Sequence, residues 1–113
     1  MTRPTLHLVP AARWDAWDPA APYLPAAYEA DGFVHCTDGD EEMLKTANRF
    51  YRSDPQPFVL LTVDLDATGS PWRFDDPGSP FPHIYGPISP AAITEVRRFV
   101  RNDDGAFTAI ERR

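Results

Sequence analysis

FVLLTVDL (residues 58–65) is the longest apolar run in the chain, and it contains the β-branched residues Val59, Thr62 and Val63. A continuous apolar run of this length is typical of a strand that is buried on both faces. Prolines stand just before it, at positions 55 and 57. We therefore predict that residues 58–65 form the central strand, against which the other elements pack.

A long amphipathic helix is predicted before this strand, over about residues 38–52. Apolar residues recur there with helical spacing and form one face: Met43, Leu44, Ala47, Phe50 and Tyr51. Thr37 or Asp38 is expected to cap the helix, with Asp40 or Glu41 three residues later as in a capping box. The helix ends near Arg52.

The remaining elements are expected to be short. Strands are predicted around His7, over GFVHCT (32–37), in PWRF (71–74) and in HIYG (83–86). Short helical turns are predicted at 12–17 and after Ser89, with an irregular proline-rich connection at 18–31. The last two strands would form a closing hairpin around NDDG. The pattern indicates an α+β fold in one domain, residues 1–113.

Composition narrows the classes of function. The chain has 113 residues, 42% hydrophobic and 25% charged, which is ordinary for a globular domain. A net charge of −6 and a pI near 4.8 argue against nucleic-acid binding. One cysteine allows no internal disulfide, and no apolar run has the length of a signal peptide or membrane span. We expect a cytoplasmic protein with a small-molecule ligand and without a membrane partner.

Three histidines are the main candidate functional residues, because each lies among apolar residues of a predicted strand: His7 in LHLV, His35 in GFVHCT and His83 in FPHIYGPI. They could be structural core residues, zinc ligands or the lining of one organic-ligand site. Catalytic zinc is often held by three protein ligands, but these spacings match no compact zinc signature. We therefore expect no metal site.

Cys36 follows His35 directly and raises the alternative of a Cys–His nucleophile. Neighbouring residues of a strand point to opposite faces, so these two side chains are not expected to pair. A cysteine in a strand is more often a small buried apolar residue. We predict that His35 faces a cleft and Cys36 faces the core.

An organic-ligand cleft is the remaining functional hypothesis. Histidine nitrogens and Thr or Tyr hydroxyls suit the hydroxyls of a ribose, and aromatic rings such as Phe50, Tyr51 or Tyr85 suit a flat base.

GFVHCT, the helix containing ANRFYR, the strand FVLLTVDL and FPHIYGPI occur in an order that resembles the DUF952 family of small bacterial proteins. The resemblance covers about residues 7–93, and residues 94–113 look like a C-terminal hairpin or extension. Thr37 stands where the family commonly has serine.

The resemblance implies an ADP-ribosyltransferase-like fold, in which a small split mixed or antiparallel sheet surrounds an NAD-shaped cleft. By this analogy His7, on the first strand, holds a ribose, and GFVHCT with its helix walls the nicotinamide pocket. The late strand usually carries a glutamate that stabilises positive charge on the sugar. This chain has His83 and Tyr85 there instead.

These considerations predict a histidine-lined cleft for NAD or another nucleotide-like ligand. His35 and His83 would be catalytic, and the ligand-binding residues would be His7, Thr37, Arg49 and Tyr85. The reaction, if there is one, would be ribosyl transfer or N-glycosidic hydrolysis. The alternatives are a non-catalytic binding module, which the missing glutamate favours, and a His-ligated metalloprotein.

Overall fold

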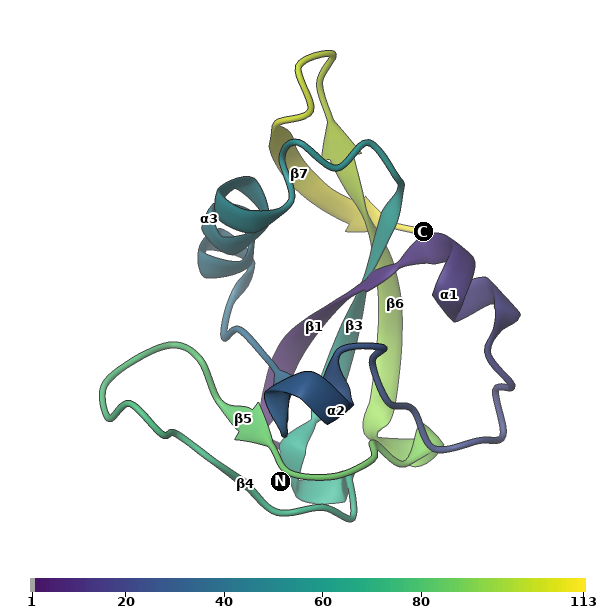
Figure 1. The fold of residues 1–113 in the computed structure, drawn as a ribbon, viewed down its shortest axis with the longest axis vertical. Coiled ribbons are helices and arrows are strands. Elements are labelled where there is room, and N and C mark those ends of the chain that lie inside the picture. The colour runs from purple at the N-terminus through teal and green to yellow at the C-terminus, as the bar shows by residue number, and fades with distance from the viewer. Residues whose placement is uncertain (1) are drawn as a thin grey trace.

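The computed structural model describes residues 2–113 and has an α+β architecture with two antiparallel sheets (Figure 1). The larger sheet has four strands in the order β1-β3-β6-β7, and the smaller sheet has three in the order β2-β5-β4. Every strand pairing among these residues is antiparallel, so the antiparallel form of the predicted sheet is the one observed. The bounds of the large sheet's strands are β1 Pro4–Pro10, β3 Phe58–Asp64, β6 Ile93–Arg101 and β7 Phe107–Arg112.

Strand β3 is central, as its apolar run predicts. It pairs with β1 on one side and with β6 on the other. Its residues alternate between two hydrophobic cores: Val59 and Leu61 face one, and Phe58 and Leu60 face the other. Both faces of the strand are therefore covered, as expected for a central strand.

Helix α3 (Asp40–Phe50) covers one face of the large sheet, where Met43 and Ala47 are buried against β1 and the closing hairpin. The predicted helix is confirmed, with slightly shorter ends. The predicted cap is wrong, because the N-cap residue is Gly39 and no side chain caps the helix. Asp38 instead accepts hydrogen bonds from Arg3 (2.8 Å) and from the hydroxyl of Thr5 (2.7 Å), so its carboxylate is already engaged.

The small sheet consists of β2 (Val34–His35), β5 (His83–Ile84) and β4 (Trp72–Arg73). It lies against the other face of the large sheet, where the fully buried Val34 and Ile84 join Val59 and Leu61 in one core. The three predicted strand segments are present but contribute only two residues each. Proline and glycine flank them, which keeps these strands short.

The shorter helical elements lie at the ends of the strands. They are α1 (Ala11–Ala16), α2 (Tyr28–Asp31) and the 3₁₀ turns η1 (Leu65–Ala67) and η2 (Pro90–Ala92). Helix α2 falls in the stretch predicted to be irregular, and it ends at Gly32, whose φ of 79° favours glycine. Across residues 2–113, none of the helices has the length and apolarity that crossing a membrane requires.

Residues 36–38 join the two sheets. Thr37 pairs with Leu6 of β1 through two backbone hydrogen bonds of 2.8 and 3.0 Å. On the other side, Cys36 and Asp38 donate to the carbonyls of Pro82 and Pro80 beside β5. The chain therefore leaves the small sheet at His35 and reaches the edge of the large sheet at Thr37.

Asn48 fastens α3 to the edge strand β7. Its amide nitrogen donates to the carbonyl of Phe107 (2.9 Å), and its amide oxygen accepts from the Phe107 N–H (2.7 Å). Asn48→Ala should therefore lower the free energy of unfolding by about 1–3 kcal/mol, as expected when buried backbone groups lose their partners. Lys45→Ala, at an exposed site on the same helix, should change it by less than about 0.5 kcal/mol.

Urea denaturation of the two variants measures this difference. Equal stability of the Asn48 and Lys45 variants would contradict the role given to Asn48. Asn48→Asp provides a further comparison, because a carboxylate accepts from the Phe107 N–H but cannot donate to the Phe107 carbonyl.

Candidate functional site

The pairing of the small sheet places three polar side chains in one row. His35 of β2 is opposite His83 of β5, which is opposite Arg73 of β4. The adjacent row, Val34, Ile84 and Trp72, faces the core. Alternation along each strand separates the two rows onto opposite faces, so the small sheet has one apolar face and one histidine-bearing face.

His7 lies on β1, between the two sheets, and is bonded to the backbone of His35. Its Nδ1 is 2.6 Å from the carbonyl oxygen of His35. A carbonyl only accepts, so Nδ1 carries the hydrogen, and Nε2 of the neutral ring has a lone pair. Nε2 is buried and has no hydrogen-bond partner among residues 2–113. His7 therefore presents an unsatisfied acceptor.

Burial also keeps this ring neutral. His7 is only 5% exposed, and the loss of hydration lowers the pKa of His7 from 6.5 to about 4. The hydrogen bond to the His35 carbonyl opposes this shift without cancelling it. Near neutral pH, Nε2 is therefore an acceptor and not a donor.

Two adjoining cavities lie along the histidine face and the edge of β1. The inner cavity, of about 260 Å³, contains His7, Arg13 and Tyr23 in its wall. The outer cavity has a volume of about 570 Å³. Its wall consists of Asp31, His35, Cys36, Thr37, Thr46, Arg49, Phe50, Tyr51, Phe81 and His83. We call the two together the cleft, because both walls share five residues: Asp31, His35, Thr37, Thr46 and Tyr51.

Five of the six predicted site residues line the cleft. His7 is in the inner wall, Arg49 and His83 are in the outer wall, and His35 and Thr37 are in both. Tyr85 lines neither cavity, because its hydroxyl donates to Asp75, which also lies outside both walls. Beyond these residues, Phe81 and Arg13 belong to the walls and were not predicted.

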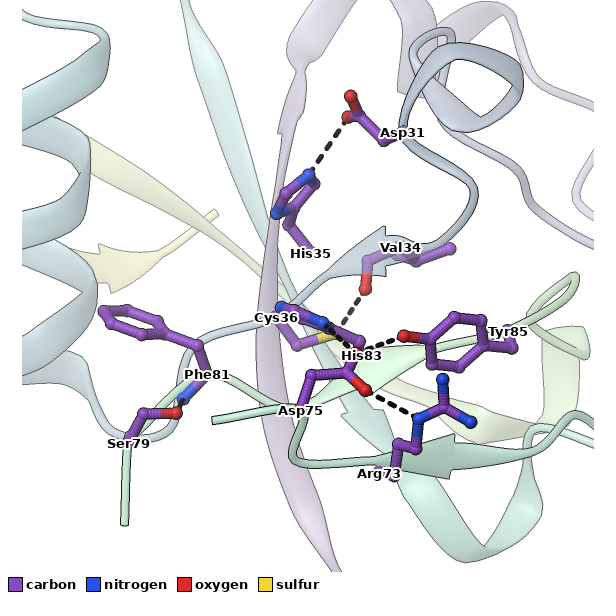
Figure 2. Close-up of polar contacts among 10 residues, drawn as sticks. All are labelled: Asp31, Val34, His35, Cys36, Arg73, Asp75, Ser79, Phe81, His83 and Tyr85. Carbon is purple, nitrogen blue, oxygen red and sulfur yellow. Dashed lines mark hydrogen bonds and ion pairs between the residues drawn. The ribbon is translucent and has the colours of Figure 1, made fainter. Parts of the chain in front are cut away.

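Two aspartates, also absent from the prediction, bind the outer histidines (Figure 2). Asp31, at the end of α2, is 3.0 Å from Nε2 of His35. Asp75 is 2.7 Å from Nδ1 of His83 and also accepts from Tyr85 and from Nε of Arg73. Asp31 stands four residues before His35, and Asp75 lies in the turn-rich loop between β4 and β5. Neither position forms a motif by itself.

The cluster around Asp75 is stabilised in its charged form. The hydrogen bonds from Tyr85, Arg73 and His83 hold the pKa of Asp75 well below its usual range. The same contact with Asp75 raises the pKa of Tyr85. Asp75 therefore remains a carboxylate, and Tyr85 remains a donor, over the whole neutral range.

Cys36 is placed as predicted relative to His35. It is 2% exposed and belongs to the core, whereas the side chain of His35 is 62% exposed. Burial raises the pKa of the Cys36 thiol, which disfavours the thiolate that a nucleophile needs. The arrangement gives no support to Cys–His catalysis.

Metal ligation receives no support either. Within residues 2–113, no group of three or more His, Cys, Asp or Glu side chains is arranged to hold a metal ion. His7 uses one nitrogen on a backbone carbonyl, and the other two histidines are each bonded to a different aspartate.

The neutrality of His7 should appear in the pH dependence of stability. Because its pKa is lowered in the folded state, the unfolded chain binds more protons between pH 6.5 and 4, and folding stability falls as the pH falls through this window. The loss from His7 alone approaches about 3 kcal/mol at pH 4. His7→Gln should lose that part of the pH dependence.

Urea denaturation of wild type and His7→Gln at pH 8, 7, 5 and 4 measures this contribution. The stability difference between the two proteins should be constant from pH 8 to 7 and should change below pH 6.5. A difference that is independent of pH throughout would contradict a buried neutral His7.

Comparison with known proteins agrees with this architecture. A crystal structure of protein CC0527 from Caulobacter crescentus is similar at a TM-score of 0.75, with 28% identity over 94% of each chain. The solution NMR structure of CC0527 gives a TM-score of 0.69 and 27% identity, over 93% of this chain and 91% of that one. No curated protein matches the sequence. The family model for proteins of unknown function DUF952 matches residues 8–96, and the chain therefore belongs to the DUF952 family.

Proposed function

We propose that the cleft binds a nucleotide-like ligand, of which NAD is one candidate, and that the ribose of this ligand occupies the inner cavity. The observation that carries the proposal is the buried Nε2 of His7, an acceptor without a partner among residues 2–113 in a ring that lines this cavity. A buried acceptor left unsatisfied costs about 1–3 kcal/mol. A ligand group that donates to it, such as a ribose hydroxyl, would remove this cost.

The aromatic rim of the outer cavity suits a flat base. Phe50, Tyr51 and Phe81 are the large hydrophobic residues exposed among residues 2–113, at 64%, 36% and 38%, and all three line this cavity. Exposed aromatic side chains gathered around one opening favour a binding site over a structural role. A base ring stacked on them would bury this apolar surface.

Arginine supplies positive charge in the walls of both cavities. Arg49 lies in the wall of the outer cavity, and Arg13 lies in the wall of the inner one. Guanidinium groups bind phosphate oxygens with charge-assisted hydrogen bonds. A phosphorylated nucleoside therefore suits the cleft better than an uncharged nucleoside does.

An ADP-ribosyltransferase-like fold is part of the same proposal. It is supported by His7 on the first strand, by two sheets with a cleft beside the point where β1 and β2 meet, and by the β2 segment that leads into α3. If the protein is an enzyme, His35 and His83 act at the ribose carbon in transfer or N-glycosidic hydrolysis. His83 replaces the usual glutamate, and the nearby Asp75 is already engaged by three donors.

A non-catalytic binding module is the second candidate, and one observation favours it. The only carboxylate in the wall of the outer cavity is that of Asp31, which is bonded to His35. No unengaged carboxylate is therefore available there to stabilise a cationic sugar. Such a module would bind the same ligands without cleaving them.

Binding of ADP-ribose and NAD, measured by isothermal titration calorimetry, tests the proposal. Arg49→Ala should weaken binding by about 10-fold or more, because a charge-assisted hydrogen bond is lost. Lys45→Ala is the matched control: it removes the same charge one turn earlier on α3, outside the cleft, and should change affinity by less than about twofold.

Equal effects of the Arg49 and Lys45 variants, or no binding of either ligand at millimolar concentration, would refute the proposal. Chromatographic detection of released nicotinamide then separates the two candidates. Bound but uncleaved NAD would favour the binding module.

A further inference from the structure

We infer that Asp31 and Asp75 are positioning residues that present opposite ring nitrogens of His35 and His83 to the cleft, so that the two histidines act as general base and general acid on an N-riboside with an uncharged base. The inference rests on the proposed nucleotide binding and deepens it. It assigns roles to two aspartates and selects the chemical class of the substrate.

The two hydrogen bonds differ in the nitrogen that they use. Asp31 takes the Nε2–H of His35, whereas Asp75 takes the Nδ1–H of His83. The nitrogens left without a partner among residues 2–113 are therefore Nδ1 of His35 and Nε2 of His83. In Figure 2, Asp31 lies beyond His35 and Asp75 lies beyond His83, at opposite ends of the pair.

The two rings are held near each other by packing as well as by pairing. Their centroids are 5.7 Å apart, as expected for directly opposed residues of adjacent strands. Phe33 stacks on His83 with a centroid distance of 3.9 Å and packs against His35 at 4.5 Å. Each ring thus has an aspartate on one side and contacts Phe33, which stacks on the face of His83 and is tilted against His35.

The cavity wall in which each histidine occurs indicates which part of a bound nucleotide it contacts. His7 occurs only in the inner wall, where the ribose hydroxyls are proposed to bind. His83 occurs only in the outer wall, with Phe50 and Phe81 of the aromatic rim, where the base is proposed to stack. His35 occurs in both walls, so it lies where the ribose meets the base, at the glycosidic bond.

This order gives each histidine a chemical role. Neutral His35 takes a proton through Nδ1 from the water that attacks the ribose carbon. As the carbon–nitrogen bond breaks, its electron pair stays on the base nitrogen, and protonated His83 gives its Nε2 proton to the base. The products are the ribose with a new hydroxyl and the free neutral base, and solvent restores both histidines.

The requirement for a general acid indicates which kind of base the substrate carries. A purine leaves as an anion unless it receives a proton, so a histidine acid accelerates its departure. The nicotinamide of NAD is a cationic pyridinium and leaves as a neutral molecule without a proton. Two opposed histidines therefore suit a purine nucleotide better than NAD.

Other ionisable groups around the pair do not supply these roles. Those around His35 and His83 are His7 of β1, Asp31 of α2, Arg49 of α3, Arg73 of β4, and, from the segments that adjoin these elements, Cys36, Tyr51, Asp75 and Tyr85. The thiol of Cys36 lies in the core. His7 is buried and neutral, the arginines stay charged, and both aspartates are bonded to the histidines.

The tautomers of the histidines can be read directly in the unmodified protein. The chain has only three histidines, so long-range ¹H–¹⁵N NMR spectra above pH 8 resolve them, with one substitution each for assignment. We expect the Nδ1–H tautomer for His83 and the Nε2–H tautomer for His35. The same tautomer in both would overturn the inference without any kinetic measurement.

Turnover is tested with adenosine 5′-monophosphate, by chromatography of released adenine, and with NAD as the comparison substrate. Asp75→Ala should lower kcat on the order of 100-fold with KM within about twofold, and should convert His83 to the Nε2–H tautomer. Asp76→Ala removes the neighbouring, exposed carboxylate, which makes no side-chain contact with an ionisable group among residues 2–113, and should leave both quantities within twofold of wild type. Asp75→Glu should recover part of the rate.

The outcomes separate this inference from the function on which it rests. Adenosine 5′-monophosphate that binds without release of adenine, or nicotinamide release from NAD that is faster than adenine release, overturns the inference and leaves nucleotide binding intact. If none of these nucleotides binds, the proposed function itself is refuted.

Discussion

The hydrogen bond from Nδ1 of His7 to the carbonyl of His35 is the interaction on which the site depends. It joins β1 of the large sheet to β2 of the small sheet, two residues before Thr37 pairs with Leu6. It also fixes the tautomer of a buried ring and so determines that Nε2 is an acceptor. One contact thereby couples the relative position of the two sheets to the polarity of the cleft beside them.

Elements with a strong local pattern could be predicted from the sequence. The apolar run at 58–65 became the central strand, and Met43, Leu44 and Ala47 of the apolar stripe became the face of α3 that packs on the sheet. Phe50 and Tyr51 of the same stripe are exposed instead and line the cleft. The helix cap could not be predicted, because Asp38 is used by Arg3 and Thr5, which are distant in sequence. Helix α2 was missed because it is a single turn within a proline-rich connection.

The histidines of the site could be predicted from the sequence, but the residues that hydrogen-bond to them could not. Apolar neighbours placed His7, His35 and His83 on strands, and strand alternation separated His35 from Cys36. Tyr85 was expected in the cleft, but the hydrogen bond to Asp75 turns its hydroxyl away from both cavities. The partner of each outer histidine comes from a turn or loop, where no periodicity links the two residues before the chain is folded.

The central claim is that the two sheets bring three histidines to one ligand. A crystal structure of the protein with bound ADP-ribose tests it most directly. We expect a ribose hydroxyl at about 2.6–3.2 Å from Nε2 of His7, with the ligand extending past His35 toward His83. A ligand bound outside the cleft, or a protein group or ordered water that occupies Nε2 of His7 while the ligand is present, would contradict the account.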